Sequence, residues 1–402
     1  MMDFDALTRD CEAIWQSCGG TKLRLPAVKK ELQKENMKQL HAMRKDWQTF
    51  MDRAMEHLQE DQWKQEMDLR VLELLRKESI LNFNALEPQV QQEFLHITKQ
   101  FIRDAMRFDC EIQLADIMQA MRNVWIILLL ECMLERPLCY HKAIFAYSML
   151  YPYTDNFLDD PGITPALKKA FNHWLTKRLK GEVQRNTQPL YQEVDKLITM
   201  IEETFHRPQF PQVYEALLRI QEGQVLSLCQ GERLSKDEIL KISIYKGGAS
   251  VLADGCLMDG TLQQKEAMFC MSYGFLLQVA DDIQDMEEDR QAQQYTLASI
   301  LSSRQERLKL AEQLHTYIHE VLYHHCPIKK QAMISFVEQN CRFLLLASLA
   351  KQLHMLPAMF AIRLRKSLPI ELDEFSLMLQ DSSSWLQSNR LKTVLYAYTK
   401  AI

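Results

Sequence analysis

Two clusters of acidic residues are the part of this sequence best suited to chemistry. Both lie in otherwise apolar sequence that is typical of helices. Their aspartates are Asp155, Asp159 and Asp160 in the first cluster and Asp281, Asp282, Asp285 and Asp289 in the second. Residues four apart lie on one face of a helix, so each cluster is expected to present a stripe of carboxylates.

The charge of these clusters predicts a bound cation. Like charges four residues apart destabilise a helix by about 0.2–0.5 kcal/mol per pair, so something positive should offset their repulsion. Hard divalent cations such as Mg²⁺ prefer carboxylate oxygens as ligands. Two such stripes suit a substrate that brings its own negative charge, such as a diphosphate. The alternative for either cluster alone is a solvated helix face, but both in one chain favour the functional interpretation.

The composition indicates that helices position these groups. Only 11 Gly and 12 Pro occur in 402 residues, and leucine and the 21 methionines outweigh valine among the apolar residues. This balance favours helix over strand. The 47% apolar content supports a large core, so we expect an all-α protein. Glycines that cluster over residues 223–274, inside helical sequence, predict close helix packing or backbone access to a ligand.

Residues 1–110 differ in character from the rest of the chain. They are polar and densely charged, with an amphipathic pattern over residues 47–58. We expect them to form an N-terminal helical extension packed on the core. Residues 111–402 are more apolar and contain both acidic clusters, so this range is the predicted catalytic domain.

Charge, cysteines and hydropathy limit the binding partners and the cellular location that we expect. The net charge of −5 gives no support for nucleic-acid binding. The 10 cysteines form no CxxC pair and no secretory signal precedes them, so we expect reduced thiols in a cytoplasmic protein. The most apolar run, residues 124–133, is too short to span a bilayer. No transmembrane segment is predicted, although a greasy substrate leaves room for a peripheral membrane contact.

A series of motifs resembles one enzyme family. In order, the motifs are Glu222-Gly223-Gln224, Tyr245-Lys246-Gly247, the segment from Gly274 through Gln278 to Asp285, and Tyr295-Thr296-Leu297. Their order and spacing resemble the trans-isoprenyl diphosphate synthase (polyprenyl synthetase) family, which shares a superfamily with the class I terpene synthases. The resemblance covers roughly residues 140–300.

The resemblance implies a helical bundle around a deep apolar cavity. Aspartates on opposite walls would hold Mg²⁺, three ions in all, and these would bind a prenyl diphosphate. The implied metal ligands are the seven aspartates of the two clusters. The residues expected to act in catalysis are Asp155, Asp159, Asp281, Asp285 and Lys246. Those expected to bind diphosphate are Lys246, Gln278 and Arg290. Arg233 is an alternative to Arg290, although the simpler interpretation of Arg233 is a surface residue. Many relatives are dimers, so a homodimer is implied by analogy.

The chemistry of an allylic cation predicts a further set of residues. Such a cation needs an apolar, aromatic wall that excludes water and stabilises the positive charge. Aromatic residues near the acidic clusters are the candidates for this wall, namely Phe145, Tyr147, Tyr151, Phe157 and Phe275. Without the motifs, the same residues are ordinary core residues.

The sequence departs from the chain-elongating members of the family. Those members carry two arginines after the first aspartate motif, where this chain has Pro161-Gly162-Ile163-Thr164-Pro165. They also carry a GGKRxRP segment before that motif, and the one similar segment here, residues 19–26, lies too far from the first cluster to match it. Without these groups the chain lacks the means to hold isopentenyl diphosphate. We therefore expect a terpene synthase, a cyclase or lyase that releases diphosphate. The alternatives are a trans-prenyl diphosphate synthase, either elongating or head-to-head, and a non-catalytic subunit of a prenyl synthase heteromer.

Overall fold

The protein is all-α, as the sequence predicts. The computed structural model describes residues 2–60, 62–77, 82–182, 186–227, 234–375 and 389–399, and these ranges contain helices and their connections but no strand. Within them, no helix has both the length and the apolar character needed to cross a membrane. The cytoplasmic location and the homodimer stay predictions.

The chain folds into two compact units, each made of two segments. The first unit comprises Met1–Lys22 and Gln119–Ser348, and the second comprises Leu23–Met118 and Leu349–Ile402. The N-terminal 22 residues therefore belong with the acidic clusters rather than with the charged segment that follows them. The predicted roles of residues 1–110 and 111–402 stay predictions.

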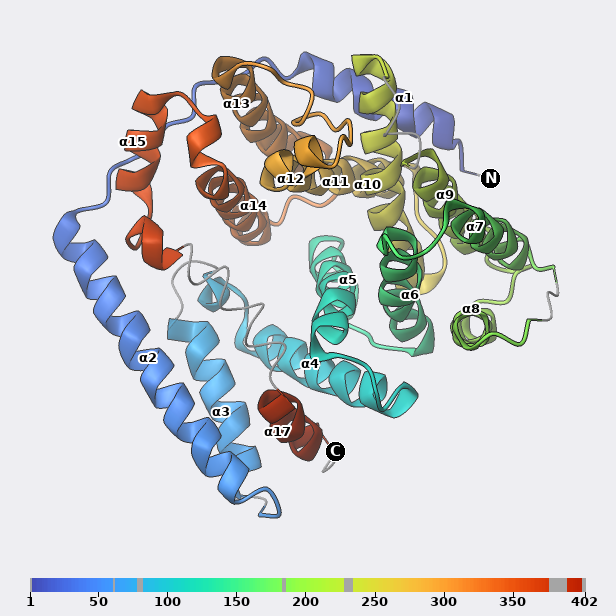
Figure 1. Ribbon diagram of the computed structural model, residues 1–402, viewed down its shortest axis with the longest axis horizontal. Coiled ribbons are helices and arrows are strands. Elements are labelled where there is room, and N and C mark those ends of the chain that lie inside the picture. Colours follow the sequence, from blue (N-terminus) through green and yellow to red (C-terminus); the bar gives the residue numbers. More distant parts are fainter. Residues whose placement is uncertain are drawn as a thin grey trace. The chain divides into compact units, whose positions relative to one another are not determined.

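The first unit contains both acidic clusters. Its α-helices, labelled in Figure 1, are α1 (Phe4–Ser17), most of α5 (Leu114–Met133), α6 (Lys142–Asp159), α7 (Pro165–Leu179), α8 (Pro189–Thr204), α9 (Pro211–Ser227), α10 (Lys236–Asp259), α11 (Gln264–Gln284), α12 (Met286–Gln291), α13 (Arg304–Glu320) and most of α14 (Gln331–Lys351). The short helix η3 (Val321–His325) follows α13. Helix α1 packs on α10, α11 and α13.

The second unit has a small core of its own. Its elements are α2 (Lys30–Glu56), α3 (Gln62–Lys77), η1 (Phe83–Ala85), α4 (Pro88–Phe108), η4 (Leu353–Met355), α15 (Ala358–Ser367) and α17 (Asn389–Thr399). Helix α17 packs on α2 and α4. The buried residues of this core are Phe50, Met51, Ala54, Trp63, Met67, Val394 and Tyr398.

Local sequence signals define a helical hairpin of α10 and α11. Ser235 and Glu238 form a capping box at the start of α10, in which each side chain accepts a hydrogen bond from the other residue's backbone N–H. Gly260 ends α10 in the left-handed conformation, at φ 91°. Gln263 and Glu266 form a second capping box that starts α11. Because the connection is so short, the two helices are antiparallel neighbours and lie side by side (Figure 1).

Two glycines let α10 and α11 touch backbone to backbone. A Cβ on Gly247 would lie 2.5 Å from the Cβ of Gln278 and 2.6 Å from the backbone oxygen of Gly274. A Cβ on Gly274 would lie 2.2 Å from the backbone oxygen of Gly247. No side chain fits at these distances. The contact confirms the predicted close packing, and it holds Lys246 beside Gln278, one turn after Gly274.

The substitution Gly274→Ala tests this contact. The added methyl group would collide with a backbone oxygen that cannot rotate away, so the free energy of unfolding should fall by about 1–3 kcal/mol. Gly19→Ala is the matched control, because a Cβ there meets no atom within 4 Å. Urea denaturation followed by circular dichroism measures both variants. Equal stability of the two would show that α10 and α11 separate without cost.

Candidate active site

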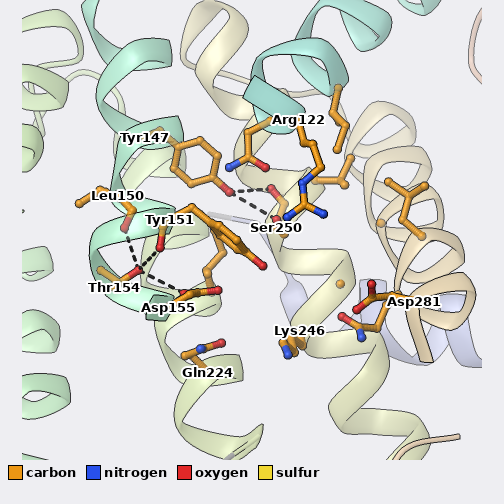
Figure 2. A pocket seen from close by; sticks show the side chains of 18 of the residues that line it. Arg122, Tyr147, Leu150, Tyr151, Thr154, Asp155, Gln224, Lys246, Ser250 and Asp281 are labelled. Carbon is orange, nitrogen blue, oxygen red and sulfur yellow. Dashed lines mark hydrogen bonds between the residues drawn. The ribbon is translucent and has the colours of Figure 1, made fainter. Parts of the chain in front are cut away.

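A cavity of about 370 Å³ lies within the first unit. Its walls come from α5, α6, α7, α9, α10, α11 and α14. The lining residues from α6 recur at helical spacing and are Tyr147, Leu150, Tyr151, Thr154, Asp155 and Leu158. The lining residues from α11 are Gly274, Leu277, Gln278, Asp281 and Gln284. Helical spacing on two walls thus brings Asp155 of the first cluster and Asp281 of the second to one cavity (Figure 2).

A smaller pocket of about 60 Å³ adjoins this cavity. The two share Lys246, Gln278 and Asp281. The remaining lining of the small pocket is mostly acidic or hydroxylic and consists of Ile242, Ser243, Asp282, Asp285, Asp289, Gln294 and Thr296. The structure therefore gathers all four aspartates of the second cluster around one pocket.

The junction of α11 and α12 keeps this acidic stripe together. Helix α11 ends at Gln284, and Asp285 links it to α12. The backbone N–H of Asp285 donates to the backbone oxygen of Asp281 at 2.9 Å. The backbone N–H of Asp289 likewise donates to the backbone oxygen of Asp285 at 2.8 Å. The helical course continues across the junction, so the four-residue spacing still places these carboxylates on one side.

Asp282 is the most buried carboxyl group of the second cluster, with 3% of the residue exposed. Gln278 Nε2 donates to its Oδ1 at 2.8 Å, and the backbone N–H of Leu297 donates to its Oδ2 at 3.2 Å. Burial raises the pKa of Asp282 to about 7, and the hydrogen bond from Gln278 opposes that rise. Gln278 therefore orients a carboxyl group as well as lining the cavity.

One ammonium group acts on both clusters. Burial raises the pKa of Asp289 to about 6, although Thr296 Oγ1 donates a hydrogen bond to it at 3.0 Å. Burial likewise raises the pKa of Asp155 to about 6. The positive charge of Lys246 opposes the shift of each, and also that of Asp282. Lys246 therefore lies within electrostatic reach of both clusters.

The chemistry of this donor set fits Mg²⁺. Burial and mutual repulsion penalise the charged form of these carboxyl groups, and a nearby cation would reverse that penalty. In the described part of the chain, no three His, Cys, Asp or Glu side chains converge closely enough to hold a metal by themselves. Mg²⁺ commonly takes one or two carboxylates and completes its coordination with water and substrate phosphate. The arrangement suits an ion bound together with a phosphorylated ligand; the ion and its number stay predictions.

Several predicted site residues lie away from both cavities. Asp159, Asp160 and Arg290 are exposed and line neither one. Helix α6 ends at Asp159, so the chain turns away before Asp160. Asp160 Oδ1 accepts a hydrogen bond from the backbone N–H of Gly162 at 2.7 Å and so belongs to that turn. Arg233 lies outside the described residues.

Two tyrosines among the predicted wall residues line the cavity. The hydroxyl group of Tyr147 donates to the backbone oxygen of Ser250 at 3.1 Å (Figure 2). Tyr151 also lines the cavity, and it is 36% exposed. Burial raises the pKa of Tyr151, and the charges of Asp155 and Asp281 raise it further. The phenol therefore lies within reach of both acidic clusters.

The three predicted phenylalanines belong to the surrounding packing instead. Phe275 packs edge-to-face on Tyr317, with 5.5 Å between ring centroids. Phe157 packs on Phe171 at 5.0 Å, and Phe145 is buried without lining the cavity. Successive helical residues are turned by about 100°, so a residue next to a lining position points elsewhere. Phe157 and Phe275 are next to the lining positions Leu158 and Gly274, and Phe145 comes two residues before Tyr147, so all three point away from the cavity.

Arg122 is a cationic cavity residue that the sequence reasoning missed. It comes from α5, together with Gln119, Asn123 and Ile126. Its charge opposes the rise in the pKa of Tyr151, so the two side chains lie within electrostatic reach of each other in the cavity lining (Figure 2). The signal was available, because polar residues three and four apart interrupt an otherwise apolar helix.

Comparison with known proteins adds one distant similarity. No family model and no curated protein matches the chain. The structure is similar to that of a geranyltransferase from Legionella pneumophila, with 12% sequence identity and a TM-score of 0.37, over 76% of this chain and 98% of that one. A similarity at this level carries no argument, so the interpretation of the site rests on the residues of this chain.

Asp254 is a fully buried carboxyl group one turn beyond the cavity residue Ser250 on α10. Neither of its oxygens has a hydrogen-bond partner among the described residues. Burial raises its pKa well above the usual range, so folding favours the protonated form.

The free energy of unfolding should carry the signature of this proton. The unfolded chain ionises Asp254 above about pH 4, whereas the folded chain keeps the proton, so stability falls by about 1.4 kcal/mol per pH unit until the folded-state pKa is reached. Asp254→Asn cannot ionise. Subtracting its pH profile from that of the unsubstituted protein should therefore leave this slope. Guanidinium denaturation between about pH 5 and about pH 7.5 gives both profiles, and parallel profiles would show that Asp254 ionises in the folded protein.

Proposed function

We propose that this protein is a Mg²⁺-dependent enzyme that ionises a prenyl diphosphate, and that it acts as a terpene synthase. The observation that carries the proposal is the pairing of two cavities. A pocket lined by carboxylates adjoins a larger cavity with many leucines and two tyrosines, and Lys246, Gln278 and Asp281 line both. A prenyl diphosphate has the same two-part character, with a charged head and an apolar tail.

The charged end supports cleavage of the carbon–oxygen bond. Loss of diphosphate from an allylic carbon leaves an allylic cation and places additional negative charge on the leaving group. Lys246 puts an ammonium group where that charge develops, and Gln278 holds Asp282 in position. Bound Mg²⁺ would supply further positive charge for the diphosphate oxygens. The aspartates that would hold it are Asp155, Asp281, Asp285 and Asp289.

The apolar end supports control of the cation. Leucines from α6, α7 and α9 line the cavity, namely Leu150, Leu158, Leu175, Leu179 and Leu217. Such a lining excludes the water that would quench a carbocation. The rings of Tyr147 and Tyr151 offer cation–π stabilisation on the α6 wall.

A second candidate is a trans-prenyltransferase, and Arg122 is the observation that favours it. The sequence lacks the usual arginines for a second substrate, but α5 brings a guanidinium group to the same cavity. Arginine forms bidentate contacts with phosphate. Such a contact would let the cavity hold an isopentenyl diphosphate beside the prenyl substrate.

A product assay separates these functions. Purified protein with Mg²⁺ receives prenyl diphosphates of ten, fifteen, twenty or twenty-five carbons, each with and without isopentenyl diphosphate, and products are identified by mass spectrometry. We expect a hydrocarbon or terpene alcohol from a single prenyl diphosphate. A longer diphosphate formed only with isopentenyl diphosphate would support the prenyltransferase. No turnover of any substrate would support a non-catalytic subunit of a heteromer.

Variants of the first cluster test the geometry of the site. Asp155→Asn should lower kcat by about 100-fold or more, because Asp155 faces the cavity and serves the charged end. Asp160→Asn is the control within the same cluster. It should keep near-normal kcat, because the Asp160 side chain lines neither cavity and accepts a hydrogen bond from the backbone N–H of Gly162. Circular dichroism melts confirm folding of both. Equal loss of activity in the two variants would contradict the assignment of Asp155 alone to the cavity.

A further inference from the structure

Two stretches of this acidic chain contain basic residues but no acidic ones. The net charge of the chain is −5, yet no Asp or Glu occurs between Glu12 and Glu31 or between Glu338 and Glu371. Six of the basic residues that these stretches give to the second unit flank the points where the stretches meet, and we call them the basic cluster. They are Arg24, Lys29, Lys30, Arg363, Arg365 and Lys366.

The fold of the second unit joins the two stretches. The backbone N–H of Val28 donates to the oxygen of Lys366 at 2.7 Å. One turn into α2, Gln33 Nε2 donates to the oxygen of Leu368 at 2.8 Å. All six side chains of the basic cluster are exposed, and none of them pairs with an acidic side chain in the described part of the chain. Like charges that tertiary structure brings together without a counterion suit an anionic partner.

Helix α15 places apolar side chains beside this charge. Met359 is 67% exposed and Ile362 is 47% exposed. With Arg363 and Lys366 they occupy positions i, i+3, i+4 and i+7, which share one face of the helix. The opposite side of α15 is anchored in the protein, since Leu364 is fully buried. The exposed face is therefore held in place by the fold.

We propose that this face of α15, with the basic cluster, docks on the surface of an anionic lipid bilayer. Basic side chains at such a surface are attracted to the acidic headgroups, while exposed apolar side chains of an interfacial helix enter the headgroup–acyl boundary. A nucleic acid would satisfy the charge but would leave Met359 and Ile362 in water. The bilayer is the partner that uses both features. The proposal does not depend on the proposed function.

Vesicle sedimentation of the full chain tests the proposal. We expect the protein to bind vesicles containing about one-third phosphatidylglycerol, to bind less at high salt, and to ignore pure phosphatidylcholine vesicles. The triple variant Arg363→Glu, Arg365→Glu and Lys366→Glu should lower the partition coefficient by about 100-fold, because each basic side chain contributes about a factor of five. The double variant Met359→Ser and Ile362→Ser should lower it by about 10-fold.

A matched control keeps the change in net charge constant. Lys169, Lys180 and Lys265 are exposed lysines of the first unit, and changing all three to Glu should leave vesicle binding unaltered. Circular dichroism melts show that each variant folds. Absence of binding to both vesicle types, or equal binding to both, would overturn the proposal. So would equal weakening by the control, or tight binding of single-stranded DNA by a protein that ignores anionic vesicles.

Discussion

The backbone contact between Gly247 and Gly274 decides where the charged groups of the first unit lie. Each glycine lines the cavity, and a Cβ at either would penetrate the facing helix. Because α10 and α11 approach this closely, Lys246 stands next to Gln278, and Asp281 follows one turn later. Capping boxes at the start of both helices and the left-handed Gly260 between them set the register of the hairpin. The position of the lysine thus follows from main-chain geometry.

The site that this hairpin forms with α6 and α12 concentrates negative charge at a cost to the folded state. Burial raises the pKa of Asp155, Asp282 and Asp289, and one lysine offsets the repulsion only in part. Natural proteins commonly concentrate such unfavourable terms at functional sites. A cation and an anionic substrate bound together would relieve them, so the electrostatic penalty of the empty pocket becomes binding free energy for the occupied one.

Helical periodicity explains which site residues could be predicted from the sequence. The aspartates of the second cluster were predictable because a four-residue spacing survives the junction of α11 and α12. The aromatic wall could not be predicted in full. A shift of one residue turns a helical side chain by about 100°, and the sequence does not show which face of the helix lines the cavity. Phe275 and Phe145 illustrate this, since both lie in the packing around the cavity. Arg122 was not predicted, because the family resemblance places the arginines after the first cluster and Arg122 lies before it, on α5. The all-α fold could be predicted from the composition alone. The division into two units of two segments each could not, because it depends on contacts between distant parts of the chain.

The separation between the hairpin and the rest of the cavity wall has a consequence for how the protein could diversify. Leu175, Leu179 and Leu217 come from α7 and α9, whereas the charged groups of α10 and α11 are held by their own backbone contact. Under the proposed function, substitutions at these leucines would reshape the space around the apolar tail of the substrate and leave the charged groups in place. Related proteins could therefore form different products by the same type of reaction. A combinatorial library confined to these three positions would test which carbon skeletons form when the charged residues of α10 and α11 are left unchanged.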